Sequence, residues 1–395
     1  MAYRRPNTDG RAWPEADVLF RRDPRWWGAD AAYSVPLSAG RILWLFGDTF
    51  FGANRPQARL IHNTIGIQDG PDPTTAALVP HMGGTPNDPA PFFAAEAGTW
   101  LWPMAGARTG VGIVVFFMRV RSARPDLPTV IAAWREEGSL NFFEVFDWSA
   151  ALIRNPDDPV GEWQVDMLDT PPAVNRIMPG AGAFADGEHL YAYGWRDGHE
   201  LRPGWIRKRP RYRGFWRPRL AYLLRWPVEQ VAAGLFNPQW WSGRGWDLDA
   251  ARAVAVLDSP ATEFTVHQDP VAGGFVLTEA AGWLRGIDAI LALRRLRVLK
   301  RLPRVSRVLS LTGLLRVSLS VRRADAPQGP WSDPVRVFTP RVARDVLVYA
   351  GKAHPQLAGE GLICTYAQIA LKADRTLGDD TLYYPRFVHI AALTA

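Results

Sequence analysis

Cysteine is almost absent from the sequence, since Cys364 is the single one in 395 residues. One thiol excludes a disulfide framework within the chain and argues against a cysteine-based metal site. Cys364 lies in the apolar segment 361–366, where a buried structural thiol is expected. Clusters of His, Cys and Asp with zinc-ligand spacing are also missing, as is a glycine-rich loop ahead of a helix. We therefore expect no metal ion and no cofactor.

Long apolar runs are missing as well. No window of the sequence reaches transmembrane length, and residues 1–10 lack the apolar stretch of a signal peptide. As given, the sequence predicts a soluble cytoplasmic protein, or an exported one if a leader has been removed. Hydrophobic residues make up 47% of the chain and charged residues 22%, which is a globular rather than a disordered composition.

Turn-forming residues and tryptophan are abundant. The chain has 35 glycines and 33 prolines, which divide it into short segments and favour strands over long helices. Many of the 18 tryptophans lie beside turn residues, where they could stack on sugar rings or pack in a core. The composition therefore indicates an all-β protein.

A repeated hairpin suggests the architecture. A glycine-containing turn followed by an aromatic or β-branched strand recurs five times, at intervals of roughly 70 to 90 residues. These turns lie at Gly40, Gly112, Gly187, Gly274 and Gly361. A short strand is predicted ahead of each turn, at Tyr33 to Leu37, Thr99 to Met104, Pro179 to Phe184, Phe264 to Asp269 and Lys352 to Leu357. Each hairpin would be the innermost pair of one blade, facing a central channel.

We therefore expect a single five-bladed β-propeller over residues 1–395. The approximate blades are 23–90, 91–170, 171–258, 259–340 and 341–395, with Ala16 to Arg22 as an N-terminal closing strand. Further strands are predicted in the outer parts of the blades, among them Thr129 to Trp134, Val335 to Phe338 and Thr381 to Ile390. A β-sandwich would also fit short strands, but it gives no reason for five similar hairpins.

The net charge of +7 comes from two segments rather than from an even distribution. Segment 201–219 alternates basic and aromatic residues, which suits a solvated loop between blades or a surface for nucleic acid or acidic glycans. Segment 284–307 is a basic insertion in the fourth blade, and placed on a helix it would have an imperfect apolar face that ends before Pro303. It could contact an anionic membrane or another subunit peripherally.

Two aspartates frame the first hairpin. Asp30 enters its first strand and Asp48 leaves its second, so antiparallel pairing would bring both carboxyl groups to the same end. Paired carboxyl groups beside aromatic side chains are what glycoside hydrolysis requires. The alternative is that Asp30 caps a turn and that Asp48, following Gly47, belongs to an ordinary loop.

Three segments carry a family resemblance, namely Gly28 to Leu37, Leu43 to Thr49 and Gly351 to Leu357. They resemble a five-bladed propeller family first catalogued as a domain of unknown function, part of which is glycoside hydrolase family 183. The resemblance implies endo-acting cleavage of D-arabinan, with a broader kinship to the family 43 furanosidases. It also implies that two aspartates at the ends of the first inner hairpin are catalytic, and these correspond to Asp30 and Asp48. The absence of a leader and the basic insertion at 284–307 depart from the family.

Furanoside cleavage needs a protonated acid at the leaving oxygen and an ionised carboxylate that attacks directly or activates water. Asp30 and Asp48 could supply this pair, because repulsion between neighbouring carboxylates keeps one of them protonated. The sequence does not say which of them is the acid. The repeat places Glu263 of the fourth blade near the position of Asp30, as a third channel carboxylate or as a solvated residue beside a strand.

Five further residues are candidate substrate contacts. Trp100 and Trp102 alternate on one strand face, where they would stack on sugar rings or pack in the core. His62 and Asn63 follow the first hairpin, and the amide could bond a substrate hydroxyl. His354 could tune a carboxylate, hold a central ion or water, or be a structural histidine.

The sequence as a whole predicts a glycoside hydrolase that acts on a furanose-containing glycan such as D-arabinan. The alternative is a non-catalytic carbohydrate-binding or membrane-surface-associated propeller. Nucleic-acid binding ranks last, because basic and aromatic residues do not come together on one recognised scaffold.

Overall fold

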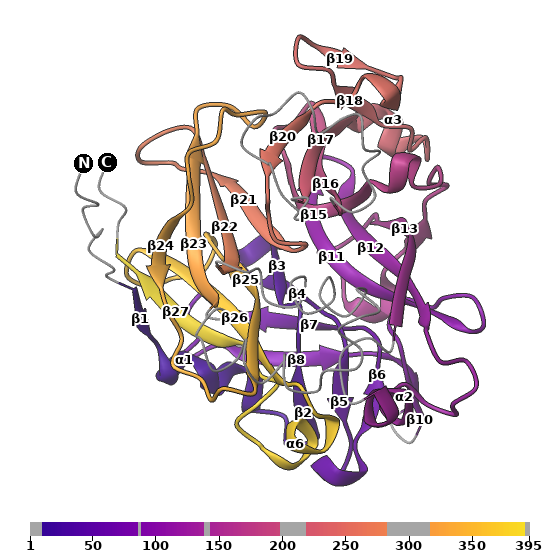
Figure 1. The fold of residues 1–395 in the computed structure, drawn as a ribbon, viewed down its shortest axis with the longest axis vertical. Helices are drawn as coiled ribbons and strands as arrows, with labels where there is room; N and C mark the ends of the chain where they lie inside the picture. Colours follow the sequence, from indigo (N-terminus) through magenta and orange to yellow (C-terminus); the bar gives the residue numbers. More distant parts are fainter. Residues whose placement is uncertain (1–9, 86–87, 138–142, 198–218, 283–316, 392–395) are drawn as a thin grey trace, which may run out of the picture.

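The computed structural model describes residues 10–85, 88–137, 143–197, 219–282 and 317–391. Within these ranges the protein is all-β, with short helices between strands (Figure 1). Segment 284–307 and all of segment 201–219 except Arg219 lie outside the described residues, as do the partner contacts predicted for them. None of the described helices is long and apolar enough to span a membrane.

Five antiparallel sheets of four or more strands follow one another along the described chain. The first contains β3 (Tyr33–Pro36), β4 (Ile42–Phe46), β7 (Thr64–Asp69) and β8 (Ala77–His81). The second contains β11 (Thr99–Thr109), β12 (Gly112–Ser122), β13 (Phe143–Ile153) and β14 (Val165–Met167). The third contains β15 (Met178–Ala185), β16 (His189–Arg196), β17 (Leu220–Pro227), β18 (Gln239–Trp241), β19 (Trp246–Asp247) and β20 (Ala255–Asp258).

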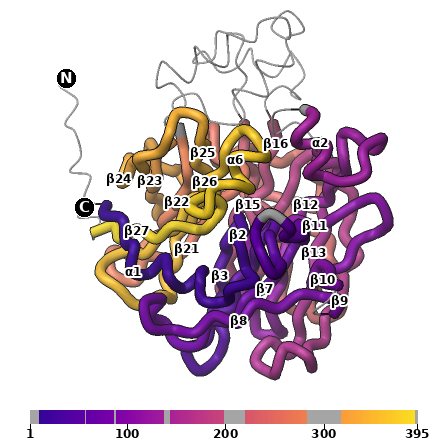
Figure 2. The backbone as a smooth tube through the Cα atoms, turned by 90° about the horizontal axis from the view of Figure 1, so that it is seen from below, coloured from indigo at the N-terminus to yellow at the C-terminus, as the bar shows by residue number. Residues whose placement is uncertain are grey.

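The last two sheets complete the set. The fourth contains β21 (Phe264–Gln268), β22 (Phe275–Gly282), β23 (Val317–Ala324) and β24 (Val335–Phe338). The fifth contains β25 (Val346–Ala353), β26 (Leu362–Ala370), β27 (Arg386–Ile390) and β1 (Gly10–Ala12). The first strand of each sheet contacts the first strand of the next, and His354 after β25 bonds Ser34 of β3. The first and last described strands pair in the fifth sheet, where the indigo β1 lies beside the yellow β27 (Figure 2).

Several predicted elements have different positions or types in the structure. The closing strand predicted at Ala16 to Arg22 is wrong, because that segment forms α1 (Pro14–Asp17) and a 3₁₀ turn (Val18–Arg21), and β1 closes the sheet instead. Ala16, Leu19 and Phe20 are buried, and this helical spacing lets one face of the segment pack into the core. Thr129 to Trp134 is also not a strand, since α2 (Val130–Glu137) begins where Thr129 Oγ1 accepts a hydrogen bond from Ala132 N.

The fifth inner strand lies earlier than predicted. We expected it at Lys352 to Leu357, whereas β25 ends at Ala353 and the chain then turns, with Leu357 N bonding His354 O. Pro355 has no N–H to continue a ladder, which explains why pairing stops there. The strand predicted at Val335 to Phe338 is confirmed as β24.

The hydrophobic core fills the spaces between neighbouring sheets. Its largest cluster joins the second and third sheets through residues such as Phe116, Trp148, Tyr193 and Trp226. Eight tryptophans are buried within the part of the chain that the structure describes. Core packing therefore accounts for much of the tryptophan content, as one of the two sequence interpretations expected.

Candidate active site

Three neighbouring strands of the first sheet, β3, β4 and β7, are each interrupted at the same end of the sheet. Beyond the break, β2 (Trp26–Ala29), β5 (Thr49–Phe51) and β6 (Arg59–Ile61) form a small sheet of their own. Asp30, Asp48 and His62 each lie at one break. The predicted pairing of the hairpin is confirmed, with Tyr33 opposite Leu45. The main chains of the two aspartates are adjacent, since Asp30 N lies 3.4 Å from Asp48 O.

The backbone at the break is tightly constrained. Ala31 and Ala32 have φ values of 62° and 52°, in the left-handed region that alanine rarely adopts. Gly47 lies directly under the Asp30 carboxyl group, and a Cβ atom at Gly47 would overlap Asp30 Oδ1. Strained backbone of this kind concentrates at functional sites, where surrounding structure holds it.

Asp30 is held by two tyrosines of the fifth sheet region. Tyr349 Oη donates to Asp30 Oδ2 at 2.8 Å and Tyr383 Oη donates to the same oxygen at 3.1 Å. Burial, together with the nearby charges of Asp48 and Glu263, raises the pKa of Asp30 to about 8, although the two tyrosine hydrogen bonds oppose the shift. Asp30 is therefore mostly a neutral acid near pH 7.

Asp48 has a different set of partners. Its Oδ1 accepts hydrogen bonds from Trp102 Nε1 at 2.7 Å and pairs with His62 Nδ1 at 2.9 Å. An indole N–H can only donate, so this oxygen of Asp48 acts as an acceptor. The His62 ring stacks on Trp100, with centroids 4.4 Å apart and planes 13° apart, which fixes its orientation.

Glu263 forms an ion pair with a lysine. Lys352 Nζ lies 2.8 Å from Glu263 Oε2, and the lysine side chain is fully buried, 4.2 Å from the centre of the Tyr33 ring. Burial lowers the pKa of Lys352, and the charges of Glu263 and Asp30 oppose that shift. Glu263 lines the same pocket as the two aspartates, and its side chain is mostly buried.

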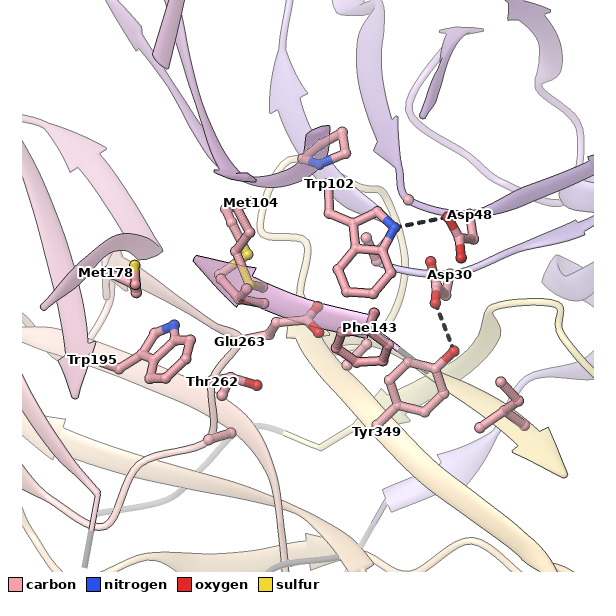
Figure 3. Close-up of a pocket in the computed structure, with 18 of the residues that line it drawn as sticks. Asp30, Asp48, Trp102, Met104, Phe143, Met178, Trp195, Thr262, Glu263 and Tyr349 are labelled. Carbon is pink, nitrogen blue, oxygen red and sulfur yellow. Dashed lines mark hydrogen bonds between the residues drawn. The ribbon is translucent and has the colours of Figure 1, made fainter. Parts of the chain in front are cut away.

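The three carboxyl groups face one pocket of about 550 Å³ (Figure 3). Trp102 and Phe143 present aromatic surface to it beside Asp48, and their rings contact each other with centroids 4.6 Å apart. Pockets of this size accommodate small ligands of a few rings. Within the described residues no group of three or more His, Cys, Asp or Glu side chains could hold a metal ion.

Four of the predicted contact residues do not line this pocket. His62 contacts Asp48 through Nδ1. Trp100 is 6% exposed and stacks on the His62 ring. The Asn63 amide donates to the carbonyl oxygens of Phe93 and Leu101, both at 3.0 Å, so it is not available to a substrate hydroxyl as we had expected.

His354 is a structural histidine in this arrangement. It is fully buried, and its ring nitrogens contact the hydroxyl oxygens of Ser34 and Thr365 at 2.5 and 2.8 Å. Burial and the nearby positive charge of Lys352 lower the pKa of His354 to about 3, so the ring is neutral. It connects the fifth sheet to the first rather than contacting the carboxyl groups.

Sequence reasoning missed Tyr349, Tyr383 and Lys352. Lys352 had a usable signal, since it is a lysine within a strand whose other residues are apolar or small. Tyr349 and Tyr383 had none, because a tyrosine near a strand or a turn is ordinary.

Comparisons with known proteins relate the chain to several others. The family model described as Domain of unknown function (DUF5005) matches residues 15–158. A crystal structure from Bacteroides ovatus ATCC 8483, provisionally described as a hydrolase, is 14% identical with a TM-score of 0.65, covering 97% of this chain and 92% of that chain. The shared fold is therefore present over nearly the whole chain.

Two other solved structures are more distant. The GH43_1 enzyme from Xanthomonas citri complexed with xylotriose is 12% identical with a TM-score of 0.44, covering 97% of this chain and 94% of that chain. The endo-arabinase from Bacteroides thetaiotaomicron VPI-5482 is 10% identical with a TM-score of 0.41, covering 93% and 95%. No curated protein matches the sequence significantly.

Proposed function

We propose that this protein is a glycoside hydrolase that cleaves a furanose-containing glycan, D-arabinan or a related arabinofuranosyl polymer. In this proposal the five sheets are the five blades of a β-propeller, and the pocket lies at the mouth of its channel. The fold alone does not assign an activity, because such architectures serve many functions. The activity is therefore inferred from the chemistry of the pocket.

The observation that carries the proposal is the contrast between two carboxyl groups in one pocket. Asp30 bonds two tyrosine hydroxyls and has a pKa raised to about 8, so it holds a proton that it could give to the leaving oxygen. Asp48 accepts from an indole N–H, which suits a carboxylate. Glycoside cleavage needs one group of each kind.

The chemical roles follow from these environments. Asp30 protonates the glycosidic oxygen as the bond to the anomeric carbon breaks. Asp48 either attacks that carbon or takes a proton from an attacking water, and the first route retains the anomeric configuration while the second inverts it. Glu263 keeps Asp30 protonated through its negative charge, which is among the causes of the raised pKa of Asp30.

The remaining charges of the pocket favour a neutral glycan. Arg121 pairs with Glu144 at 2.9 Å, and Arg219 pairs with Asp197 at 2.8 Å. Lys352 is likewise paired with Glu263. Because these three cations are paired with carboxylates, each offers little attraction for a uronate or a phosphate, whereas apolar rings suit the faces of neutral sugars.

Variants of the two aspartates test the proposal. Wild type should release oligosaccharides from D-arabinan, and Asp30→Asn and Asp48→Asn should each lose at least about a thousandfold in kcat while still binding the glycan. Asp333→Asn, which removes an exposed carboxyl group, is the matched control. Binding without cleavage by wild type, indifferent to both substitutions, would instead identify a carbohydrate-binding protein. Proton NMR of the first product distinguishes retention from inversion.

A further inference from the structure

The pocket extends well beyond the carboxyl groups. Figure 3 shows Asp30, Asp48 and Tyr349 at one end and Met178, Trp195 and Thr262 at the other. The far end is built from β15, β16 and the loop before β21, so it belongs to the third and fourth sheets. Glu263 lies between the two ends.

Trp195 forms an apolar wall at the far end and is held firmly. The guanidinium carbon of Arg219 lies 5.1 Å from the centre of the indole ring. Asp197 Oδ1 in turn accepts from Arg219 Nε at 2.9 Å. Trp195 is 8% exposed, and its Nε1 has no hydrogen-bond partner among the described residues. Trp195 therefore contributes a fixed and mostly buried aromatic surface to the wall.

Thr262 lies on a loop that is hydrogen-bonded to the fourth sheet. Ala261 N donates to Glu279 Oε2 at 2.7 Å, and Glu279 is fully buried and paired with Arg322 at 2.9 Å. A buried and hydrogen-bonded ion pair of this kind holds its surroundings in one geometry. Thr262 and Glu263 are adjacent on this loop, so the same support positions both side chains at the pocket wall.

We propose that the Trp195 and Thr262 end is a second sugar-binding subsite, which holds the neutral sugar unit linked to the one at Asp30 and Asp48. This inference rests on the proposed function. It assigns Trp195 and Thr262 to the sugar unit next to the one that is cleaved, with Glu263 between the two units. The Thr262 hydroxyl bonds a sugar hydroxyl, and the Trp195 indole packs against the sugar ring.

Binding measured without turnover tests the subsite. Titration calorimetry on Asp30→Asn would use α-D-arabinofuranosyl oligosaccharides of one to four residues. Affinity should rise when the second residue is added. Adding Thr262→Val should weaken binding of the two-residue and longer ligands about three- to tenfold, the effect of one hydrogen bond, and should not weaken binding of the single sugar. Trp195→Phe, which keeps an aromatic side chain in the wall, should also weaken binding of the two-residue and longer ligands.

The control is Thr75→Val, an equivalent change at an exposed threonine that does not line the pocket. Affinity that is independent of ligand length, or an equal loss for the single sugar and the longer ligands, would overturn the subsite. Cleavage by wild type is measured separately. If wild type does not cleave the glycan but Thr262→Val still weakens binding of the longer ligands alone, the subsite is supported and the hydrolase activity is rejected.

Discussion

Asp30→Asn should change how the stability of the protein depends on pH. The folded state raises the pKa of Asp30 from 3.8 to about 8, mainly by burial. Between these values the folded protein holds a proton that the unfolded chain releases. The free energy of unfolding of the wild-type protein therefore decreases, through this group, as pH rises from about 4 to about 8. The asparagine variant has no carboxyl group here and escapes that loss.

The size of the effect follows from linkage. One proton of difference changes the free energy of unfolding by ~1.4 kcal/mol per pH unit. Between pH 5 and pH 7 the variant should therefore gain about 2.5 kcal/mol relative to wild type. Most single substitutions that remove a buried hydrogen-bonding group destabilise a protein, so a pH-dependent gain is a distinctive result.

Urea unfolding followed by tryptophan fluorescence at pH 5, 6 and 7 measures this difference for wild type and variant. Asp333→Asn controls for the loss of one carboxyl charge at an exposed position. A difference between Asp30→Asn and wild type that stays constant within about 0.5 kcal/mol over this range would refute the argument, since each pH unit should add ~1.4 kcal/mol. It would mean that Asp30 is ionised in the folded protein and cannot act as the acid.

Three further predictions concern the supports of the site. Gly47→Ala should lower kcat at least about tenfold, because the new Cβ displaces the Asp30 carboxyl group from its reacting position, as initial rates on D-arabinan would show. Lys352→Met should cost about 3 to 5 kcal/mol in urea unfolding, because it leaves Glu263 without its cation. Tyr349→Phe removes a hydrogen bond that lowers the pKa of Asp30, so the basic limb of the rate profile should move to higher pH.

Two of these predictions have a comparison variant, and the third has a result that would contradict it. Gly110→Ala places a methyl group in open space between β11 and β12 and should leave kcat within twofold, so equal losses in both glycine variants would contradict the steric argument. Pairing Lys352→Met with Glu263→Gln should restore part of the lost stability, and no recovery would argue against the ion pair. If Tyr349→Phe leaves the pH–rate profile unchanged, Tyr349 does not affect the pKa of Asp30.

Patterns of neighbouring residues predicted those site residues that lie close together in the sequence. Asp30 and Asp48 belong to one hairpin, and its antiparallel pairing is readable from alternation and a turn. Predictions failed where packing decided the structure. The Ala16 segment contains residues that a strand could also bury, and its helical turn depends on the core into which Leu19 and Phe20 pack. Asn63 looked like a ligand because its buried partners, the carbonyls of Phe93 and Leu101, are not visible in a sequence.

The sequence by itself determined the all-β composition, the repeated hairpins and the two aspartates at one hairpin end, because strands, turns and hairpins depend on neighbouring residues. Only the tertiary structure decided how those aspartates differ. Tyr349 and Tyr383 lie 319 and 353 positions after Asp30 in the chain, and they reach it because the fifth sheet packs beside the first. Burial and charge at Asp30 are sums over residues brought together from several sheets, so a chemical role that depends on them appears only once the chain has folded.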